Sequence, residues 1–166
     1  MAECLRSDVS GSQWAMAVMM GEEHYRAWGD LLHSVETGEI AFDKVFGKPI
    51  FAHLSEHPDS AAIFDQAMTS VHGRETEPMV DAFDFSDIST ITDIGGGNGT
   101  VIAAVLSRFP GMSGILFDLP HVIERAHPNL EAAGVAERCR TVSGNFFESV
   151  PAGADVYLMR HIIHDW

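Results

Sequence analysis

The last residues of the sequence combine side chains that can move protons. His161, His164 and Asp165 fall within five residues of one another, directly after an apolar run that begins near Leu158. Histidine suits general acid–base chemistry because the intrinsic pKa of its imidazole, about 6.5, lies close to neutral pH. The same side chains could ligate a metal, but their spacing is not the His-Glu-x-x-His pattern. Three interpretations therefore remain open: a general base, a metal site, and ordinary loop residues.

A glycine cluster near the middle of the sequence is the second candidate site. Asp93 is followed by alternating glycines at Gly95, Gly97 and Gly99, after a β-prone run at residues 90–94. Glycine lets the backbone approach a ligand closely and adopt positive φ, and a following helix offers unpaired N–H groups. The pattern is not the Gly-x-Gly-x-x-Gly of dinucleotide-binding proteins, and no Gly-Lys-Ser/Thr of a P-loop is present. A nicotinamide-dependent oxidoreductase is therefore disfavoured, and a simple turn is the alternative.

The charged residues around this loop indicate the sign of the charge on its ligand. Residues 75–107 contain no Lys or Arg, which is unusual for a phosphate cradle but suits a cationic ligand. Asp118 ends the next apolar run, about 20 residues beyond the glycines, where α/β proteins usually hold a ribose. The other interpretation of Asp118 is a helix N-cap or a turn residue before Pro120.

Alternating strands and helices must position these residues. The sequence predicts strands at residues 90–94, 114–118, 138–142 and 154–159, and helices at 98–109 and 120–134. This alternation predicts an α/β fold, a Rossmann-like parallel sheet with flanking helices. Because such sheets usually have more strands, we expect the sheet to be incomplete after the fourth.

The N-terminal half shows helical periodicity instead. Apolar spacing and turn residues predict a helix from residue 12 to about 35 that stops at Gly38, a turn at 47–49, a short helix at 50–54, and a helix from an N-cap at Asp59 to about Phe83. Phe64 and Met68 share one face of the last helix, and core packing is the simplest interpretation of that face. We expect a helical segment over residues 1–85, followed by a Rossmann-like domain over residues 86–166.

Composition and charge exclude several classes of protein. A chain of 166 residues with 46% hydrophobic content can bury about 70% of its unfolded surface and form a core. The formal net charge of −14 disfavours binding to nucleic acid or to an anionic membrane. Only Cys4 and Cys139 are present, so a disulfide framework is not expected, and we predict a reducing, cytoplasmic location. The apolar run at residues 14–20 is too short to span a bilayer, and no signal-peptide pattern precedes it.

Four segments together resemble one family, the class I S-adenosylmethionine-dependent O-methyltransferases of the plant phenolic and bacterial natural-product type. The segments are Asp93–Gly99, Phe117–Ile123, Gly144–Phe147 and Leu158–Trp166. The resemblance runs from about residue 15 to the last residue. Any one segment alone would be weak evidence, but four in the same order are highly specific.

The resemblance implies that the cofactor is S-adenosyl-L-methionine. Gly95 and Gly97 would lie nearest to its methionine and ribose portions. Asp118 would bind the ribose hydroxyls, and Leu119 would flank the adenine.

The resemblance implies two further cofactor contacts, and at each the residue differs from the one common in the family. Asn145 and Phe146 match the pair that holds the adenine amine and ring, although the family commonly has Asp at the first position. An amide carbonyl still accepts a hydrogen bond there, but without a formal charge. Arg160 stands where a basic residue, often Lys, contacts the cofactor.

The resemblance also implies the reaction. His164 matches the catalytic base of the family's His-Asp-Trp motif, and no metal is implied. Phe64 and Met68 fall at positions similar to those that line the acceptor pocket. The implied activity is methyl transfer to a hydroxyl of a small aromatic or polyketide-like natural product.

Two departures from the family keep other functions open. Family members begin with a winged-helix-like dimerisation region and continue beyond the His-Asp-Trp motif, and we find no counterpart of either. The alternatives are a cofactor-binding fragment or split-enzyme half without independent catalysis, and a relative that runs another reaction such as hydroxylation. The expected partners are a small-molecule acceptor and either a second copy or a complementary chain.

Overall fold

The computed structural model describes residues 2–9 and 11–165, except for the side chains of His72, Arg74 and Asp165. Trp166, the last residue of the His-Asp-Trp motif, lies outside the described residues. The contacts divide the chain into two compact units, residues 1–72 and 73–166. Among the described residues, no helix combines the length and the apolar character that crossing a membrane requires.

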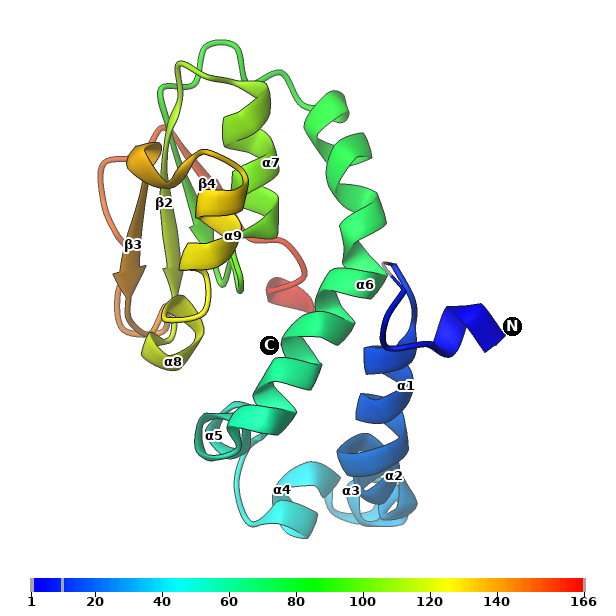
Figure 1. The fold of residues 1–166 in the computed structure, drawn as a ribbon. Coiled ribbons are helices and arrows are strands. Elements are labelled where there is room, and N and C mark those ends of the chain that lie inside the picture. The colour runs from blue at the N-terminus through cyan, green and yellow to red at the C-terminus, as the bar shows by residue number, and fades with distance from the viewer. Residues whose placement is uncertain (1, 10, 166) are drawn as a thin grey trace. The chain divides into compact units, whose positions relative to one another are not determined.

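The first unit is helical (Figure 1). Its helices are η1 (Ala2–Leu5), α1 (Trp14–Met19), the π-helix η2 (Met20–His24), α2 (Tyr25–Gly29), α3 (Leu31–Thr37), α4 (Ala41–Phe46), α5 (Ile50–Glu56) and the start of α6 (Pro58–Ala82), which continues into the second unit. A small core forms where α1 packs on α6, with Ala15, Met19 and Ala67 buried. Phe64 and Met68 pack against this core.

The predicted single helix over residues 12–35 is wrong, because the structure breaks it twice. A π-helical turn replaces regular α-helix around Gly21, and α2 ends at Gly29, before Asp30 with φ −106°. Glycine inside a helix costs about 1 kcal/mol relative to alanine, so both breaks fall at weak points of the sequence. The predicted stop is confirmed, since Gly38 caps α3 with φ 75°.

Two other helix predictions need correction. The helix predicted to follow an N-cap at Asp59 starts two residues earlier than Ser60, with Pro58 as its first residue and Asp59 in its first turn. Proline is well suited to this position because its fixed φ is helical and its missing N–H would be unpaired there anyway. The helix α4, which lies between Ile40 and Gly47, was not predicted.

The second unit is built on a four-stranded sheet. Its strands are β1 (Thr90–Ile94), β2 (Ser113–Asp118), β3 (Cys139–Ser143) and β4 (Val156–Leu158). Their order is β3-β2-β1-β4 and every pair is parallel, with Asp93 opposite Leu116 on one side and Leu158 on the other. The predicted strands are all present, within two residues of their predicted ends. The predicted α/β class and parallel sheet are therefore confirmed.

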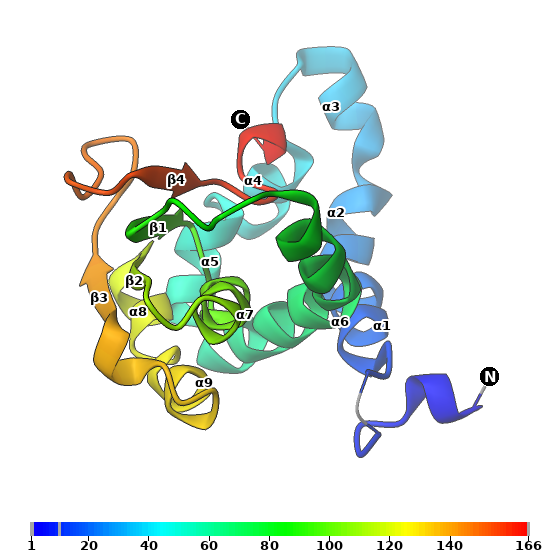
Figure 2. The same ribbon diagram turned by 90° about the horizontal axis from the view of Figure 1, so that it is seen from above.

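Helices connect these strands. They are α7 (Thr100–Arg108), α8 (Pro120–Ile123), α9 (His127–Ala132) and the short 3-10 turns η3 (Ala136–Arg138) and η4 (Ile163–Asp165). Figures 1 and 2 show α7 and α9 on the same face of the sheet. The single helix predicted at residues 120–134 is wrong, because it divides into α8 and α9. Pro128 has no N–H to donate to a residue one turn earlier, so a helix cannot continue through it unbroken.

The core of the second unit lies between the sheet and α7. Ile91 and Leu116 from the central strands meet Ile102 and Leu106 from α7, and all four side chains are fully buried. Because β2 and β4 flank β1 on opposite sides, the chain leaves the C-terminal end of β1 at a topological switch point. Open parallel sheets bind their ligands at such points.

Candidate functional site

The predicted site residues of the second unit gather at the C-terminal edge of the sheet. Gly95 directly follows β1, Asp118 is the last residue of β2, and Asn145 follows β3 after one intervening residue. Arg160 and His164 belong to the segment that follows β4. The parallel register brings these strand ends together, although the residues are up to 69 positions apart in the sequence (from 95 to 164).

The glycine loop is held in a shape that side chains disfavour. Gly95 and Gly97 adopt φ values of 67° and 60°, in the left-handed region that favours glycine. The Gly95 N–H donates to the carbonyl of Phe117 at 2.8 Å, which fixes the loop to the end of β2. A Cβ atom at Gly97 would meet no heavy atom within 4 Å, so the backbone is open to a ligand there. At Gly96, by contrast, a Cβ would lie 2.7 Å from the Asp93 carboxylate.

Asp118 fastens the loop from the opposite strand. Its carboxylate accepts hydrogen bonds from the N–H of Gly97 at 2.8 Å and from the N–H of Leu119 at 2.6 Å. The N-cap of α8 is Leu119, so the alternative interpretation of Asp118 as a helix cap is wrong. The structure thus brings together Gly95, Gly97, Asp118 and Leu119, and their role as cofactor contacts stays a prediction.

Asn145 and Phe146 occupy the turn after β3. The Asn145 side chain bonds within this turn, accepting from the N–H of Phe147 at 3.0 Å and donating to Glu148 at 3.3 Å. The Phe146 ring reaches the glycine loop, since its Cε1 atom would lie 4.0 Å from a Cβ atom at Gly95. Phe146 is therefore placed beside the loop, whereas the amide of Asn145 is engaged locally.

The segment after β4 is bound to α6. The guanidinium of Arg160, whose side chain is 12% exposed, donates to Thr76 at 2.7 Å and to Glu75 at 3.0 Å. The imidazole of His161 lies 2.9 Å from the same Glu75 oxygen. Ile162 sits over Gly95, where a Cβ atom would collide with its side chain.

His164 follows in η4 and is exposed. Its ring centroid is 5.6 Å from that of His161. The carboxylate of Asp165, which the metal interpretation requires, lies outside the described side chains. Among the side chains that are described, no three of His, Cys, Asp or Glu gather around one point as metal ligands would.

Asp93 lies against the glycine loop, and no role was predicted for it, although its place two residues before the first glycine was the signal. The side chain is 1% exposed, and its Oδ2 atom has no hydrogen-bond partner among the described residues. Burial raises the pKa of the Asp93 carboxyl to about 7, and repulsion by Asp118 adds to the increase. A backbone hydrogen bond from Ile102 and the charge of Arg160 act in the opposite direction.

The raised pKa of Asp93 predicts how the stability of the protein depends on pH. The folded protein holds the Asp93 proton up to about pH 7, whereas the unfolded chain releases it near pH 4, so this contribution to stability is lost as the pH rises through that window. Asp93→Asn removes the titration. We expect the free energy of unfolding of the variant, relative to wild type, to increase between pH 4 and pH 8 by on the order of 4 kcal/mol. Urea unfolding across this pH range measures the difference, and a constant offset would contradict the prediction.

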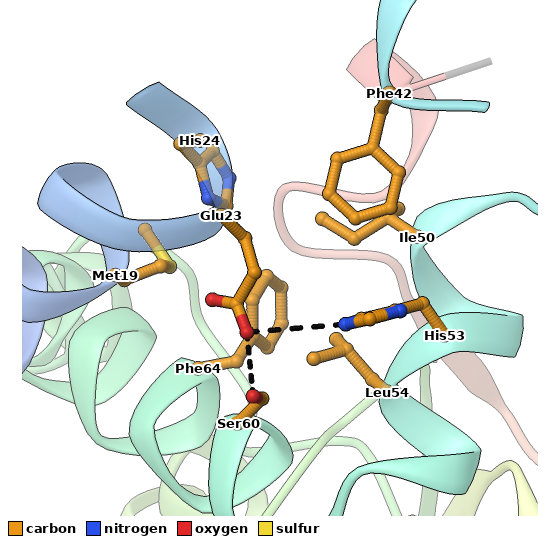
Figure 3. A pocket seen from close by; sticks show the side chains of 9 residues that line it. All are labelled: Met19, Glu23, His24, Phe42, Ile50, His53, Leu54, Ser60 and Phe64. Atoms are coloured by element: carbon orange, nitrogen blue, oxygen red, sulfur yellow. Dashed lines mark hydrogen bonds and ion pairs between the residues drawn. The ribbon is translucent and has the colours of Figure 1, made fainter. Parts of the chain in front are cut away.

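Phe64 and Met68 belong to the part of α6 that lies in the first unit. Phe64 borders a small pocket there, together with apolar side chains of α1, α4 and α5 (Figure 3). The cavity measures about 10 Å³, which is room for no more than one water molecule. Within this unit both residues serve in packing, as the simplest interpretation of their sequence spacing predicted, and their role at an acceptor stays a prediction.

The same pocket holds polar side chains that no sequence pattern indicated. Figure 3 shows the carboxylate of Glu23 between Ser60 and His53, which lie 2.5 Å and 3.9 Å from its Oε1 atom. Burial lowers the pKa of His53, and repulsion by His57 lowers it further. His53 therefore does not pair as a cation with the half-buried carboxylate of Glu23 at neutral pH.

The geometry at the sheet edge agrees with a comparison to known families. The sequence profile of the family described as "O-methyltransferase domain" matches residues 28–166. The chain belongs to this O-methyltransferase family. The family predicted from the four motif segments is confirmed.

The names of individual relatives of this chain state different reactions. The phenazine O-methyltransferase PhzM of Lysobacter antibioticus is 46% identical over 166 residues, which cover 100% of this chain and 49% of that protein. The aclacinomycin 10-hydroxylase RdmB of Streptomyces purpurascens is 35% identical over 140 residues, covering 84% of this chain and 37% of that protein. The chain spans about half the length, or less, of the curated relatives it matches.

Solved structures show the same fold. The crystal structure of LaPhzM is 46% identical and superposes with a TM-score of 0.94 over 99% of this chain and 50% of that one. The O-methyltransferase NcsB1 of neocarzinostatin biosynthesis is 27% identical, with a TM-score of 0.90 over 99% of this chain and 51% of that one. NcsB1 was crystallised with S-adenosylmethionine and 2-hydroxy-5-methyl naphthoic acid. The cofactor predicted from the sequence is thus the one bound by this relative.

Proposed function

We propose that the protein binds S-adenosylmethionine and transfers its methyl group to a hydroxyl of a small aromatic or polyketide-like natural product. One observation carries the proposal: the open glycine loop after β1 is joined to Asp118 at the end of β2, at the switch point of a parallel sheet. The membership of the chain in the O-methyltransferase family supports it.

The residues of the loop suit this cofactor. Its sulfonium and ammonium groups are cationic, and the Asp118 carboxylate lies beside the loop, which falls within residues 75–107, a stretch of sequence with no Lys or Arg. The left-handed Gly97 leaves its backbone open to close approach. We assign the ribose hydroxyls to Asp118, the methionine portion to the backbone of Gly95 and Gly97, and the adenine to residues outside the loop.

The residues that we assign to the adenine come from the turns after β2 and β3. Leu119 and Phe146 supply apolar surfaces for the ring, and the side-chain carbonyl of Asn145 accepts from its amine. To reach that amine, Asn145 must exchange its present bond to the N–H of Phe147. Arg160 approaches the cofactor while remaining bound to α6.

His164 acts as the base in this proposal. S-adenosylmethionine supplies a methyl group that its sulfonium already activates, so the protein must align the acceptor oxygen and remove one proton. A phenol has a pKa of about 10, and a neutral imidazole held against the hydroxyl takes its proton during attack. Phe64 and Met68 line the acceptor side, and the acceptor is the expected small-molecule partner.

Native mass spectrometry of the purified protein with S-adenosylhomocysteine tests the cofactor class. We expect a one-to-one adduct on a folded species, because the hydrogen bond from the Gly97 N–H to Asp118 holds the loop in shape. The same spectrum reports whether a second copy or another chain is bound, which remains a prediction. A compact protein that forms no adduct would contradict the proposal.

Hydroxylation is the second candidate, favoured by the similarity to a protein named as a hydroxylase. Incubation in air with S-adenosylmethionine, a thiol reductant and a panel of phenolic acceptors separates the two reactions by product mass, because hydroxylation needs dioxygen and two electrons. Methylation adds one CH₂ unit to the acceptor, whereas hydroxylation adds one oxygen atom. A product that gains only oxygen would overturn methyl transfer while leaving the cofactor assignment in place.

A further inference from the structure

We propose that Glu75 is a positioning residue for His164, acting through Arg160 and His161. This inference rests on the proposed function, since it concerns the base of that reaction. Glu75 lies on α6, in the second unit, and is 85 and 86 positions away in sequence from the two residues that it binds. No motif of the sequence contains it.

A single carboxylate oxygen holds two consecutive side chains. Oε2 of Glu75 accepts from the guanidinium of Arg160 at 3.0 Å and lies 2.9 Å from Nε2 of His161. The neighbouring Thr76, which is 4% exposed, accepts from the same guanidinium at 2.7 Å. Charge-assisted hydrogen bonds of this kind are short and directional, so they fix the backbone that carries them.

The backbone at this point has an unfavourable conformation. His161 has a φ of 55° and is the only non-glycine residue with positive φ in the described part of the chain. Residues other than glycine keep such a conformation only where surrounding contacts impose it. The bond from Glu75 to the His161 imidazole is such a contact. We infer that it stabilises the reversal of the chain between β4 and η4.

This reversal determines where the base lies. Immediately after His161, Ile162 packs over Gly95 of the cofactor loop, and η4 then presents His164. The ring centroids of His161 and His164 are 5.6 Å apart, so the position of the first ring bears on that of the second. We infer that Glu75 orients His164 through this segment, while the cofactor contacts assigned to Gly97 and Asp118 belong to other strand ends.

Glu75→Gln tests this role, because it keeps the size of the side chain and removes its charge. Glu77→Gln is the matched control, since Glu77 is an exposed carboxylate on the same helix. We expect kcat for Glu75→Gln to fall between about 10- and 100-fold, as for a small misplacement of a reacting group. We expect the Kd for S-adenosylhomocysteine to change less than about threefold, because the loop and Asp118 are unaltered and Thr76 still accepts a hydrogen bond from Arg160. Glu75→Asp, which restores the charge, should recover part of kcat, and Glu77→Gln should match wild type.

Hydrogen exchange, measured by mass spectrometry on a peptide covering residues 159–165, supplies a readout that needs no acceptor. Faster exchange of this peptide in Glu75→Gln than in Glu77→Gln supports the proposal. Equal exchange and equal kcat in the two variants would overturn it. A parallel loss of kcat and of S-adenosylhomocysteine binding would also overturn it, because that result indicates general damage to the site.

The two hypotheses fail in different ways. If the wild-type protein neither binds S-adenosylhomocysteine nor transfers a methyl group, the proposed function is wrong. The exchange measurement then decides alone whether Glu75 holds the segment that carries His164: unequal exchange supports the contact, and equal exchange rejects it.

Discussion

Replacing His164 with alanine is expected to abolish methyl transfer while cofactor binding survives. His164 is exposed in η4, whereas the loop contacts assigned to the cofactor come from Gly95, Gly97 and Asp118. General-base catalysis contributes about 10²- to 10⁴-fold, so the loss of turnover should fall in this range or exceed it. Turnover with S-adenosylmethionine and an acceptor found in the phenolic panel measures methyl transfer. Calorimetric titration with S-adenosylhomocysteine measures cofactor binding.

His127→Ala is the control for this experiment, because His127 is an exposed histidine on α9. It should keep both turnover and binding. If His164→Ala loses cofactor binding together with turnover, the assignment of His164 as the base is wrong, and the residue instead supports the structure of the site.

Replacing Asp118 with alanine should remove most of the affinity for S-adenosylhomocysteine. The carboxylate is assigned to two ribose hydroxyls, and a hydrogen bond to a charged group contributes about 1.5–3 kcal/mol. The expected loss is about 3–6 kcal/mol, which raises the Kd by about 10²- to 10⁴-fold. The variant also releases the N–H of Gly97 that Asp118 now holds, so the loop loses one of its links to β2 and keeps the bond from the Gly95 N–H to Phe117.

Two comparisons sharpen this test. Asp118→Asn keeps one acceptor oxygen without the charge and should bind with intermediate affinity. Asp87→Ala removes an exposed carboxylate between α6 and β1 and should bind like wild type. An Asp118→Ala variant that folds and binds S-adenosylhomocysteine with unchanged affinity would show that the ribose is held elsewhere.

The sequence predicted the sheet and its ligand-binding edge because both depend on local patterns. β1 ends where its β-prone run meets Gly95, and Asp118 ends β2 as predicted. The helices were harder to predict, since a π-helical turn at Gly21 and the break before Pro128 interrupt apolar periodicity that continues past them. Periodicity records which residues are apolar, but it does not record where the backbone hydrogen bonds change partner.

Contacts between residues far apart in the sequence are not specified by residue spacing. The bonds of Glu75 to Arg160 and His161 depend on the position of α6 against the end of β4, which no residue spacing specifies. Asp93 lay within a recognised motif, yet its raised pKa depends on how deeply α7 buries it and on Asp118 from another strand. The sequence therefore predicted which strand-end residues of the second unit gather at the sheet edge, whereas their protonation and mutual support required the structure.

In the proposed function, the carboxylate of Asp118 also bears on how the spent cofactor leaves. Methyl transfer converts a sulfonium cation into a neutral thioether, so the bound molecule would lose one positive charge. Asp118 would attract the incoming cofactor through that charge, Asp93 would add to the attraction only above about pH 7, where it is ionised, and the attraction would be absent for the product. The acidic loop therefore favours exchange of product for fresh cofactor and limits product inhibition. Added salt screens the same charges and reduces this preference.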